Sequence, residues 1–410
     1  MEEIYERCCG LDVHRDSITA CIMIGYGTQK HKIVRTFLTF TKDIKELAVW
    51  LKSHNVRHVA VESTGIYWKP IFNVFEGNEF DICLVNAQHV KNVPGRKTDV
   101  KDSEWLCKLL KCGLLSKSFI PSKIIVRLRE LLRYRQKLTR ELSSGKNRII
   151  KTLENANIKL STVFTDVFGV TAWLMICKLV NGETNPDKLT EYIDPRCKSS
   201  KADILKALEG TLQKEDRRML QLQMKHLNAI EEIIKEVEEE VALHIEPFEA
   251  EVALLKTIPG IKDMAAASII AEIGPDMNQF NSSSHLAAWA GMCPGNNQSA
   301  GKIKSSRIRK GNVHVKTMLT QVSWAISRTK NTYLGAKYRS LAPRRGKKRA
   351  IIAIGRKTLV ICYYLLKNKV PFHELGVDFL DKLEPERKAK YHLKRLEELG
   401  YHVTSTKKAA

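Results

Sequence analysis

The sequence lacks the features of membrane proteins and of secreted, disulfide-stabilised proteins. No segment reaches about 18 uninterrupted apolar residues, the length that a membrane-spanning helix needs, and no signal peptide precedes the first strand-like segment. The ten cysteines have the spacing of neither a disulfide framework nor a zinc site, and most stand among apolar residues. We therefore expect buried free thiols in a cytoplasmic protein that contains no zinc and binds no membrane.

Acidic residues are scarce relative to basic ones. Asp and Glu number 45 against 68 Lys and Arg, which gives a formal net charge of +23. A surplus of this size favours a polyanionic partner, through counterion release and long-range attraction. The hydrophobic fraction of 43% supports folded cores, and 410 residues is enough chain for two or three domains. We expect nucleic acid as the partner.

Residues 5–115 alternate strand-like and helix-like patterns. Strands are predicted at 6–12, 17–25, 32–40, 58–62 and 81–86, and helices at 42–53, 68–75 and 102–111. Three early strands followed by alternating helices and strands is the order of an RNase H-like α/β fold. We expect a first domain at residues 1–118.

The rest of the chain is predicted to be mainly helical. A helix at 123–151 carries a leucine stripe with basic residues on its other faces, and a helix at 216–245 repeats Leu220, Leu227, Ile234 and Val241 every seven residues. The second helix is acidic from Glu231 to Glu240, so the two helices either pair or dimerise. The predicted regions are a helical, coiled-coil linker at 119–248, a mainly α domain at 249–375 with a polar loop at 294–306, and a charged tail at 376–410.

Acidic residues stand at the ends of two predicted strands and at the start of a predicted helix. Asp12 ends the first strand and Glu62 the fourth, and these strands are neighbours in an RNase H-like sheet. Asp99 and Asp102, three residues apart, project from one face of the helix start. Four clustered carboxylates repel one another unless cations neutralise them, and such ligands suit Mg²⁺ or Mn²⁺. The alternative is that each acid is a helix cap or a solvated turn residue.

Eight short motifs carry a family resemblance, in order along nearly the whole chain. They are residues 10–14 (GLDVH), 61–65 (VESTG), 96–102 (RKTDVKD), 258–261 (IPGI), 288–291 (AWAG), 299–302 (SAGK), 309–312 (RKGN) and 345–348 (RGKK). As a set they resemble the DEDD-type insertion-sequence transposases, a family that includes Piv-like DNA invertases and bridge-RNA-guided recombinases.

The resemblance implies a RuvC-like metal-binding N-terminal domain, a coiled-coil middle and a transposase domain with a nucleophilic serine. By position that serine is Ser299, although Ser305 and Ser306 stay open by sequence alone. Attack of a serine on a phosphodiester forms a protein–DNA ester that conserves the bond, so strands can be rejoined without ATP. The resemblance also implies DNA as donor and target, a structured guide RNA, and a homo-oligomer (dimer or tetramer) associated with the nucleoid.

Basic residues in three groups are predicted to contact nucleic acid. They are Arg133, Arg135, Arg140 and Arg148 in the long helix; Lys302, Arg307, Arg309 and Lys310 beside the serine; and Arg344, Arg345, Lys347 and Lys348. The arginines of the long helix could instead pair with the acidic stretch Glu231 to Glu240.

We therefore predict a transposase or recombinase that cuts and rejoins DNA through Ser299, with Mg²⁺ on Asp12, Glu62, Asp99 and Asp102. One rival is a Holliday-junction-resolvase-like or invertase-type nuclease that uses the same acids, with water as the nucleophile. Another is a non-enzymatic RNA- or DNA-binding protein in which the acids are structural.

Overall fold

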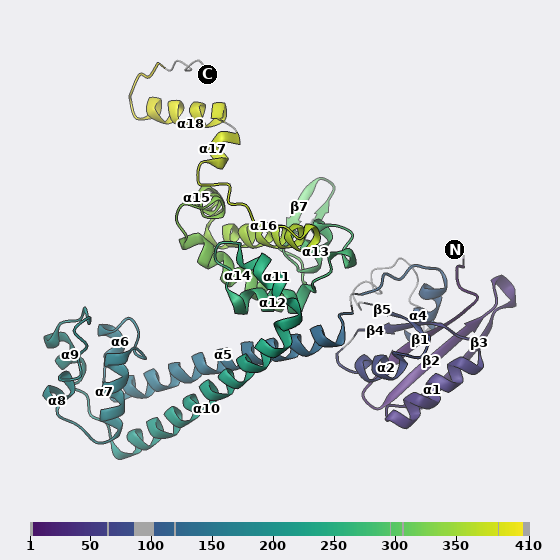
Figure 1. The fold of residues 1–410 in the computed structure, drawn as a ribbon, viewed down its shortest axis with the longest axis horizontal. Coiled ribbons are helices and arrows are strands. Elements are labelled where there is room, and N and C mark those ends of the chain that lie inside the picture. The colour runs from purple at the N-terminus through teal and green to yellow at the C-terminus, as the bar shows by residue number, and fades with distance from the viewer. Residues whose placement is uncertain are drawn as a thin grey trace. The chain divides into compact units, whose positions relative to one another are not determined.

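The chain divides into two compact units, Met1–Pro121 and Ser122–Ala410 (Figure 1). The computed structural model describes residues 3–63, 65–85, 102–118, 120–295, 297–305, 307–383 and 385–404. Among these residues, no helix has both the length and the apolar character that crossing a membrane requires. The three-way division predicted for residues 119–410 stays a prediction.

The first unit is a mixed five-stranded sheet with helices on both faces (Figure 1). Its elements are β1 (Arg7–Val13), β2 (Ser17–Ile24), η1 (Gly27–Gln29), β3 (His31–Leu38), α1 (Thr41–Ser53), β4 (His58–Glu62), α2 (Trp68–Phe75), β5 (Asp81–Val85) and α4 (Asp102–Lys111). The strand order is β3-β2-β1-β4-β5; β1, β2 and β3 pair antiparallel, and β4 lies parallel between β1 and β5. The predicted strands and helices of this unit are confirmed to within two residues.

Side chains alternate between the two faces of the sheet, so apolar residues of the strands pack into two separate cores. On one face, Leu11 and Val61 pack with Leu47 of α1 and Phe75 of α2. On the other face, Cys8 and Ala60 pack with Leu106 and Cys107 of α4. Because both faces are covered, β1 and β4 are buried along most of their length, and only their ends are open to solvent.

The second unit is almost entirely helical. Its elements are α5 (Lys123–Asn155), α6 (Leu160–Val163), α7 (Val170–Val180), α8 (Pro186–Thr190), α9 (Lys201–Ala207), α10 (Lys214–Ile245), η2 (Glu246–Phe248), α11 (Glu249–Lys256), α12 (Asp263–Ile273), η3 (Met277–Gln279), α13 (Ser283–Trp289), β6 (Asn297–Ser299), β7 (Lys302–Ser305), α14 (Val313–Arg328), α15 (Tyr333–Arg345), α16 (Lys347–Asn368), α17 (Phe379–Leu383) and α18 (Pro385–Glu398).

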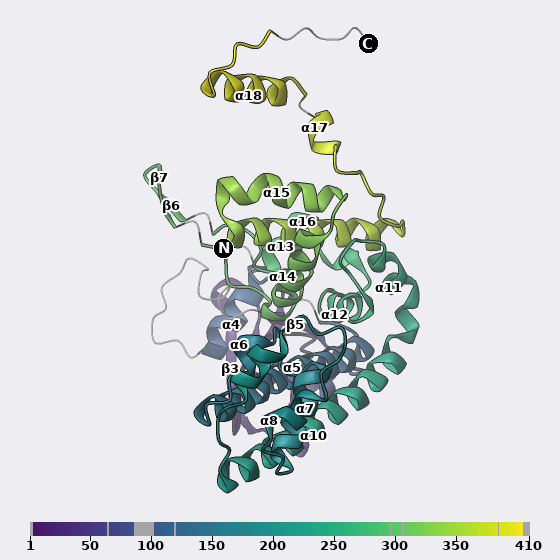
Figure 2. The ribbon, with the colours of Figure 1, turned by 90° about the vertical axis from the view of Figure 1, so that its left-hand side faces the viewer.

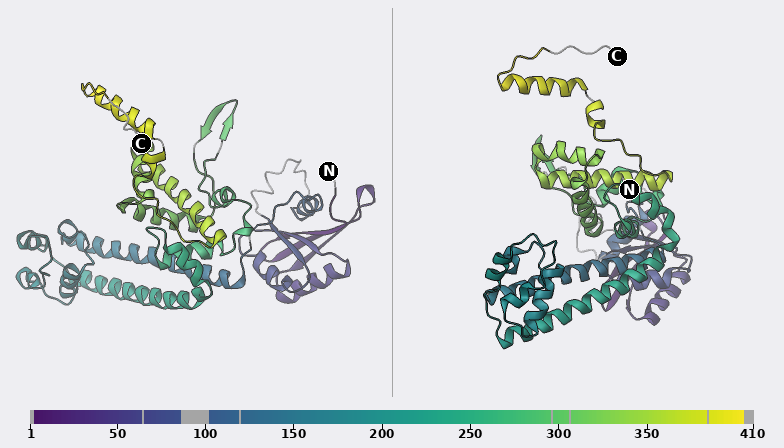
Figure 3. Two further views of the ribbon diagram at one scale, coloured as in Figure 1. Left: turned by 45° about the horizontal axis from the view of Figure 1, so that its top comes forward. Right: turned by 60° about the vertical axis from the view of Figure 1, so that its left-hand side comes forward.

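The two long helices α5 and α10 lie side by side within the chain (Figures 1 and 3). Leu128 and Leu138 of α5 pack with Ile230 and Val241 of α10, and Val241 is a member of the predicted seven-residue repeat. The backbones come close at Gly145, where an added Cβ would stand 2.7 Å from a methyl carbon of Leu227. Of the two sequence alternatives, pairing between these helices is therefore present in the single chain.

The predicted polar loop at 294–306 contains a hairpin instead. Asn297–Ser299 and Lys302–Ser305 pair antiparallel across a two-residue turn. Both turn residues have positive φ, +48° at Ala300 and +74° at Gly301, as tight hairpin turns with right-handed twist require. Figure 2 shows this hairpin standing away from helices α13 to α16. The sequence did not indicate this hairpin, because Asn297–Ser299 and Lys302–Ser305 show no alternating apolar pattern.

Candidate active site

The strand register brings Asp12 and Glu62 to neighbouring positions at one end of the sheet. The parallel β1–β4 ladder pairs Gly10 with Ala60 and Leu11 with Val61, and each acid is the next residue of its strand. Side chains alternate between faces, so Asp12 and Glu62 lie on the same face as Gly10 and Ala60, the face that α4 covers. The predicted neighbourhood of the first and fourth strands is confirmed.

Helix α4 brings a third carboxylate to this region, because it begins at Asp102 and packs on β1. The packing depends on Gly10: a Cβ there would lie 2.2 Å from the carbonyl oxygen of Ser103 and 2.5 Å from the amide nitrogen of Cys107. No side chain fits between the strand and the helix at this level. The glycine of the GLDVH motif thus allows the helix carrying Asp102 to lie directly against the strand carrying Asp12.

These carboxylates interact electrostatically. Burial raises the pKa of Asp12 above its usual value, and the negative charges of Asp102 and Glu62 raise it further. His14 acts in the opposite direction, since its Nε2 atom lies 3.3 Å from the Asp12 Oδ2 atom. The pKa of Asp12 is raised overall, so the contact with His14 does not outweigh burial and the two nearby acids. A bound cation would stabilise the ionised form of Asp12.

The donor set fits a hard divalent cation in its chemistry, because carboxylate oxygens are the ligands that Mg²⁺ and Mn²⁺ prefer. Among the described residues, however, no group of three or more His, Cys, Asp and Glu side chains is arranged so that it could hold a metal ion. Asp99, the fourth predicted ligand, lies outside the described residues. The described acids therefore supply only part of the predicted ligand set.

The predicted nucleophile, Ser299, is the last residue of β6, beside the turn of the hairpin. Its backbone pairs with Lys302 across the turn. Of the two other serines left open by sequence, Ser305 ends β7 and its hydroxyl accepts a hydrogen bond from the Arg307 amide at 3.2 Å. Ser306 lies outside the described residues. Position in the hairpin thus distinguishes Ser299, next to the tip, from Ser305, at the end of the second strand.

The basic residues predicted to contact nucleic acid fall into two structural classes. Arg133 and Arg135 form ion pairs with Glu272 and Glu238, respectively. The other ten are all exposed: Arg140, Arg148, Lys302, Arg307, Arg309, Lys310, Arg344, Arg345, Lys347 and Lys348. Among the described residues, Arg140 and Arg148 have no acidic partner. The exposed members are therefore better placed for phosphate contacts than Arg133 and Arg135.

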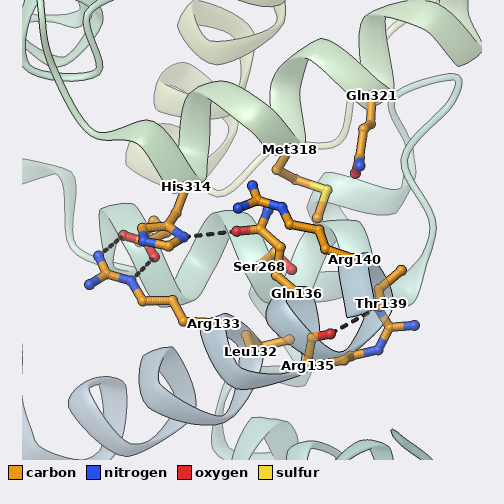
Figure 4. A pocket seen from close by; sticks show the side chains of 11 residues that line it. Leu132, Arg133, Arg135, Gln136, Thr139, Arg140, Ser268, His314, Met318 and Gln321 are labelled. Carbon is orange, nitrogen blue, oxygen red and sulfur yellow. Dashed lines mark hydrogen bonds and ion pairs between the residues drawn. The ribbon is translucent and has the colours of Figure 1, made fainter. Parts of the chain in front are cut away.

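Sequence reasoning missed a buried polar network that joins α5, α12 and α14. Glu272 is only 4% exposed and binds Arg133 of α5 and Asn312 at the start of α14. Beside it, His314 shares a 2.9 Å hydrogen bond with Gln136, at a cavity of about 110 Å³ (Figure 4). The available signal was the single acid in the otherwise small and apolar segment 265–273.

Comparisons with known proteins match an N-terminal and a C-terminal segment of the chain to transposases. A DEDD-type model described as "Transposase" matches residues 9–158, and one described as "Transposase IS116/IS110/IS902 family" matches residues 252–339. The pilin gene-inverting proteins of Moraxella bovis and Moraxella lacunata are each 23% identical over 379 residues, 88% of this chain and 96% of theirs. The transposase for insertion sequence element IS1111A of Coxiella burnetii is 23% identical over 371 residues, 88% of this chain and 89% of its own. The chain therefore belongs to the DEDD-type family of insertion-sequence transposases, which are DNA-rearranging enzymes.

Proposed function

We propose that the chain cleaves and rejoins DNA strands through Ser299, with Mg²⁺ or Mn²⁺ held by Asp12, Glu62, Asp99 and Asp102. The main support for this proposal is that the acids and the serine both lie in segments that match transposase family models. The four acids lie in residues 9–158 and the serine in residues 252–339. The strand order β3-β2-β1-β4-β5, with β1 beside β4, supports an RNase H-like (RuvC-like) fold for the first unit.

The proposed chemistry assigns separate tasks to the two residue groups. The Ser299 hydroxyl oxygen attacks phosphorus, a serine–DNA ester forms, and the departing strand end leaves as a hydroxyl that takes up a proton. The reverse attack by a strand hydroxyl breaks the ester and restores a phosphodiester. Divalent cations on the carboxylates would offset charge on the attacked phosphate. Exposed cations beside the hairpin, such as Lys302 and Arg307, would hold the flanking phosphates.

The partners in this proposal are donor and target DNA, with a structured guide RNA and a dimeric or tetrameric assembly. Guide RNA and assembly rest on the family resemblance alone. The net charge of +23 supports a polyanionic partner but does not distinguish RNA from DNA. The cytoplasm, in association with the nucleoid, is the proposed location.

Site-specific inversion is a second candidate, because two relatives are named pilin gene-inverting proteins. Inversion and transposition use the same cutting and rejoining steps and differ in which DNA ends are joined. The nuclease rival uses water as the nucleophile and leaves no protein–DNA ester.

The proposal is tested by assaying three proteins on DNA carrying the element's ends, in Mg²⁺ and with RNA co-purified from the host. Wild type and Ser305→Ala should perform strand transfer and give a denaturant-resistant protein–DNA species. Ser299→Ala should bind DNA normally but give neither product, because it lacks only the hydroxyl. Efficient strand transfer by Ser299→Ala, with no adduct in any protein, would favour the nuclease reading.

A further inference from the structure

Glu272 is a buried carboxylate outside the acidic strand ends. Its side chain is 5% exposed, and it belongs to the apolar helix α12, where Ile269, Ile270 and Ile273 are fully buried. An ionised carboxylate in such surroundings is costly unless charged and polar groups bind it. Glu272 has such groups on both oxygens, and they come from elements far apart in the sequence.

Two arginines of α5 hold Glu272 from one side. Arg133 binds both carboxylate oxygens, with Nε 2.7 Å from Oε1 and Nη2 2.8 Å from Oε2. Arg129 donates to the carbonyl oxygens of Ala271 and Glu272, at 2.8 and 2.9 Å, and thereby satisfies acceptors at the end of α12. This fork-shaped, charge-assisted contact fixes α12 in direction as well as distance against α5.

Asn312 holds Glu272 from the other side. Its Nδ2 atom donates to the Glu272 Oε2 atom at 2.7 Å. Its Oδ1 atom accepts hydrogen bonds from the amides of His314 and Val315, so the same side chain is the N-cap of α14. One amide group thus joins a helix start to a buried carboxylate, and its two functions use different atoms.

Asn312 lies at the base of the hairpin that carries Ser299. Just before it, the two hairpin arms form a neck: the Gly295 amide donates to the Arg307 carbonyl at 2.9 Å, and the Arg309 amide to the Cys293 carbonyl at 3.2 Å. Below the neck the chain segments touch, because a Cβ on Gly311 would lie 2.3 Å from the Gly291 amide nitrogen. The Asn312–Glu272 bond therefore ties the neck to the α5–α12 framework.

We propose that Glu272 is a positioning residue that fixes, through Asn312, the base of the serine hairpin on α5 and α12. The inference rests on the proposed role of Ser299 and deepens it. Among the described residues, β6 and β7 form a two-stranded sheet with each other only, so we infer that their direction depends on the neck and its attachment. Glu272 itself touches neither DNA nor the reacting atoms; its effect on chemistry passes through Asn312 and the neck.

Substitutions of Asn312 distinguish its hydrogen bond to Glu272 from its role as the N-cap of α14. Serine and aspartate are both good N-caps, but serine removes the Nδ2 donor, and aspartate also places a second carboxylate against Glu272. Asn185→Ser is the matched control, because Asn185 caps α8 through its Oδ1 atom. Among the described residues its side-chain Nδ2 atom donates to no carboxylate, and only its backbone amide does, to Glu183.

The experiment measures amide hydrogen exchange across residues 290–312 without DNA, and then the rates of DNA binding and of covalent adduct formation. Thermal unfolding of each variant is recorded first, so that comparisons are made on folded protein. We expect neck exchange to rise about tenfold in Asn312→Ser and further in Asn312→Asp, consistent with loss of a charged hydrogen bond. Adduct formation should slow by a similar factor while DNA affinity stays within about twofold.

Two results would overturn the inference: neck exchange that is the same in Asn312→Ser as in Asn185→Ser, or raised exchange with an unchanged rate of adduct formation. A third result would separate the two proposals. If wild type forms no adduct but amide exchange in the neck is raised in Asn312→Ser, the role of Ser299 is rejected and the positioning of the hairpin by Glu272 is supported.

Discussion

Asp12, whose side chain is 27% exposed, and Glu272, whose side chain is 5% exposed, have opposite electrostatic surroundings. Around Asp12, burial and the charges of Asp102 and Glu62 raise the pKa despite His14. At Glu272, burial alone would raise the pKa, but Arg133, Arg129 and Asn312 outweigh burial and lower it. The difference separates two kinds of acid: one whose ionised form is disfavoured by its surroundings, and one whose ionised form is stabilised by them.

The acidic strand ends of the first unit and the serine hairpin of the second unit also differ in how they are held. The acids of the first unit stand at the ends of buried strands and at the start of a helix packed directly on Gly10. Ser299 stands on a short hairpin whose two arms are joined by backbone hydrogen bonds at the neck. Substitutions that alter one region and leave the other intact therefore test whether the acids bind metal and the serine forms the ester, as proposed above.

The largest effect is expected when each proposed metal ligand is neutralised in turn. Asp12→Asn, Glu62→Gln, Asp99→Asn and Asp102→Asn should each reduce strand cleavage by about 100-fold or more, because each removes charge from the cation site. DNA binding should survive, and Ca²⁺ should support binding without cutting. The measurement is single-turnover cleavage over a range of Mg²⁺ concentrations. Cleavage at the wild-type rate by Asp12→Asn would remove that residue from the ligand set.

Neutralising the two kinds of acid should change stability in opposite directions. Glu272→Gln should lower the free energy of unfolding by about 3 kcal/mol, since it leaves the arginines of α5 without their buried partner. Asp12→Asn should raise it by about 0.5–1 kcal/mol in chelator, because repulsion from Asp102 and Glu62 is relieved. Urea unfolding in chelator measures both. Changes of the same sign would show that the two carboxylates do not differ as described.

The pH dependence follows from the same signs. The pKa of Glu272 is lowered on folding, so its contribution to stability is complete above the unfolded value near 4.3 and is lost as the pH falls through the folded value. The pKa of Asp12 is raised, so its ionisation costs stability as the pH rises through the folded value. Relative to wild type, Glu272→Gln should therefore be less destabilised in acid, and Asp12→Asn should lose its advantage there.

Gly10→Ala tests whether the packing of α4 on β1 sets the affinity of the first unit for metal. The new methyl group would meet backbone atoms of Ser103 and Cys107, so α4 must shift from β1. We expect a loss of about 1–3 kcal/mol in stability, with a higher Mg²⁺ concentration needed for half-maximal cleavage because Asp102 moves. Gly113→Ala, at a turn beyond α4, is a control for general destabilisation of the unit. An unchanged Mg²⁺ requirement would show that the position of α4 does not set metal affinity.

The smallest effect is expected from the exposed arginines of α5. Replacing Arg140 and Arg148 with alanine should make the logarithmic salt dependence of nucleic-acid binding shallower by about 1–2, because fewer counterions are released. Replacing Arg133 should act mainly on stability, since its guanidinium is engaged by Glu272. The slope is obtained from binding isotherms at several salt concentrations. Equal slopes for wild type and the Arg140, Arg148 variant would show that this face contacts no phosphate.

Much of the first unit could be predicted from sequence, because its strands bury apolar residues on both faces and end at identifiable acids. Asp12 and Glu62 were found as strand-end residues, and the register places them side by side. The α5–α10 pair was predictable from the seven-residue repeat of α10, but pairing and dimerisation could not be separated, since both bury the same stripe.

The hairpin and its attachment could not be predicted, because they depend on contacts between distant residues. Asn297–Ser299 and Lys302–Ser305 have no alternating apolar pattern, and the neck forms only after Gly291 and Gly311 meet. Glu272 stands 139 residues from Arg133 and 40 from Asn312, and nothing local identifies those partners.

The most direct test is to identify the atom that becomes joined to DNA. Wild-type protein is quenched during the reaction in Mg²⁺, digested with protease and nuclease, and analysed by mass spectrometry for a nucleotide-bearing peptide. The proposal predicts a nucleotide on the peptide containing residues 297–302, with fragmentation placing it on Ser299. The same adduct should be absent from Asp12→Asn and present in Ser305→Ala. A nucleotide on Ser305, on Ser306 or on any other residue, or active strand transfer with no adduct, would contradict it.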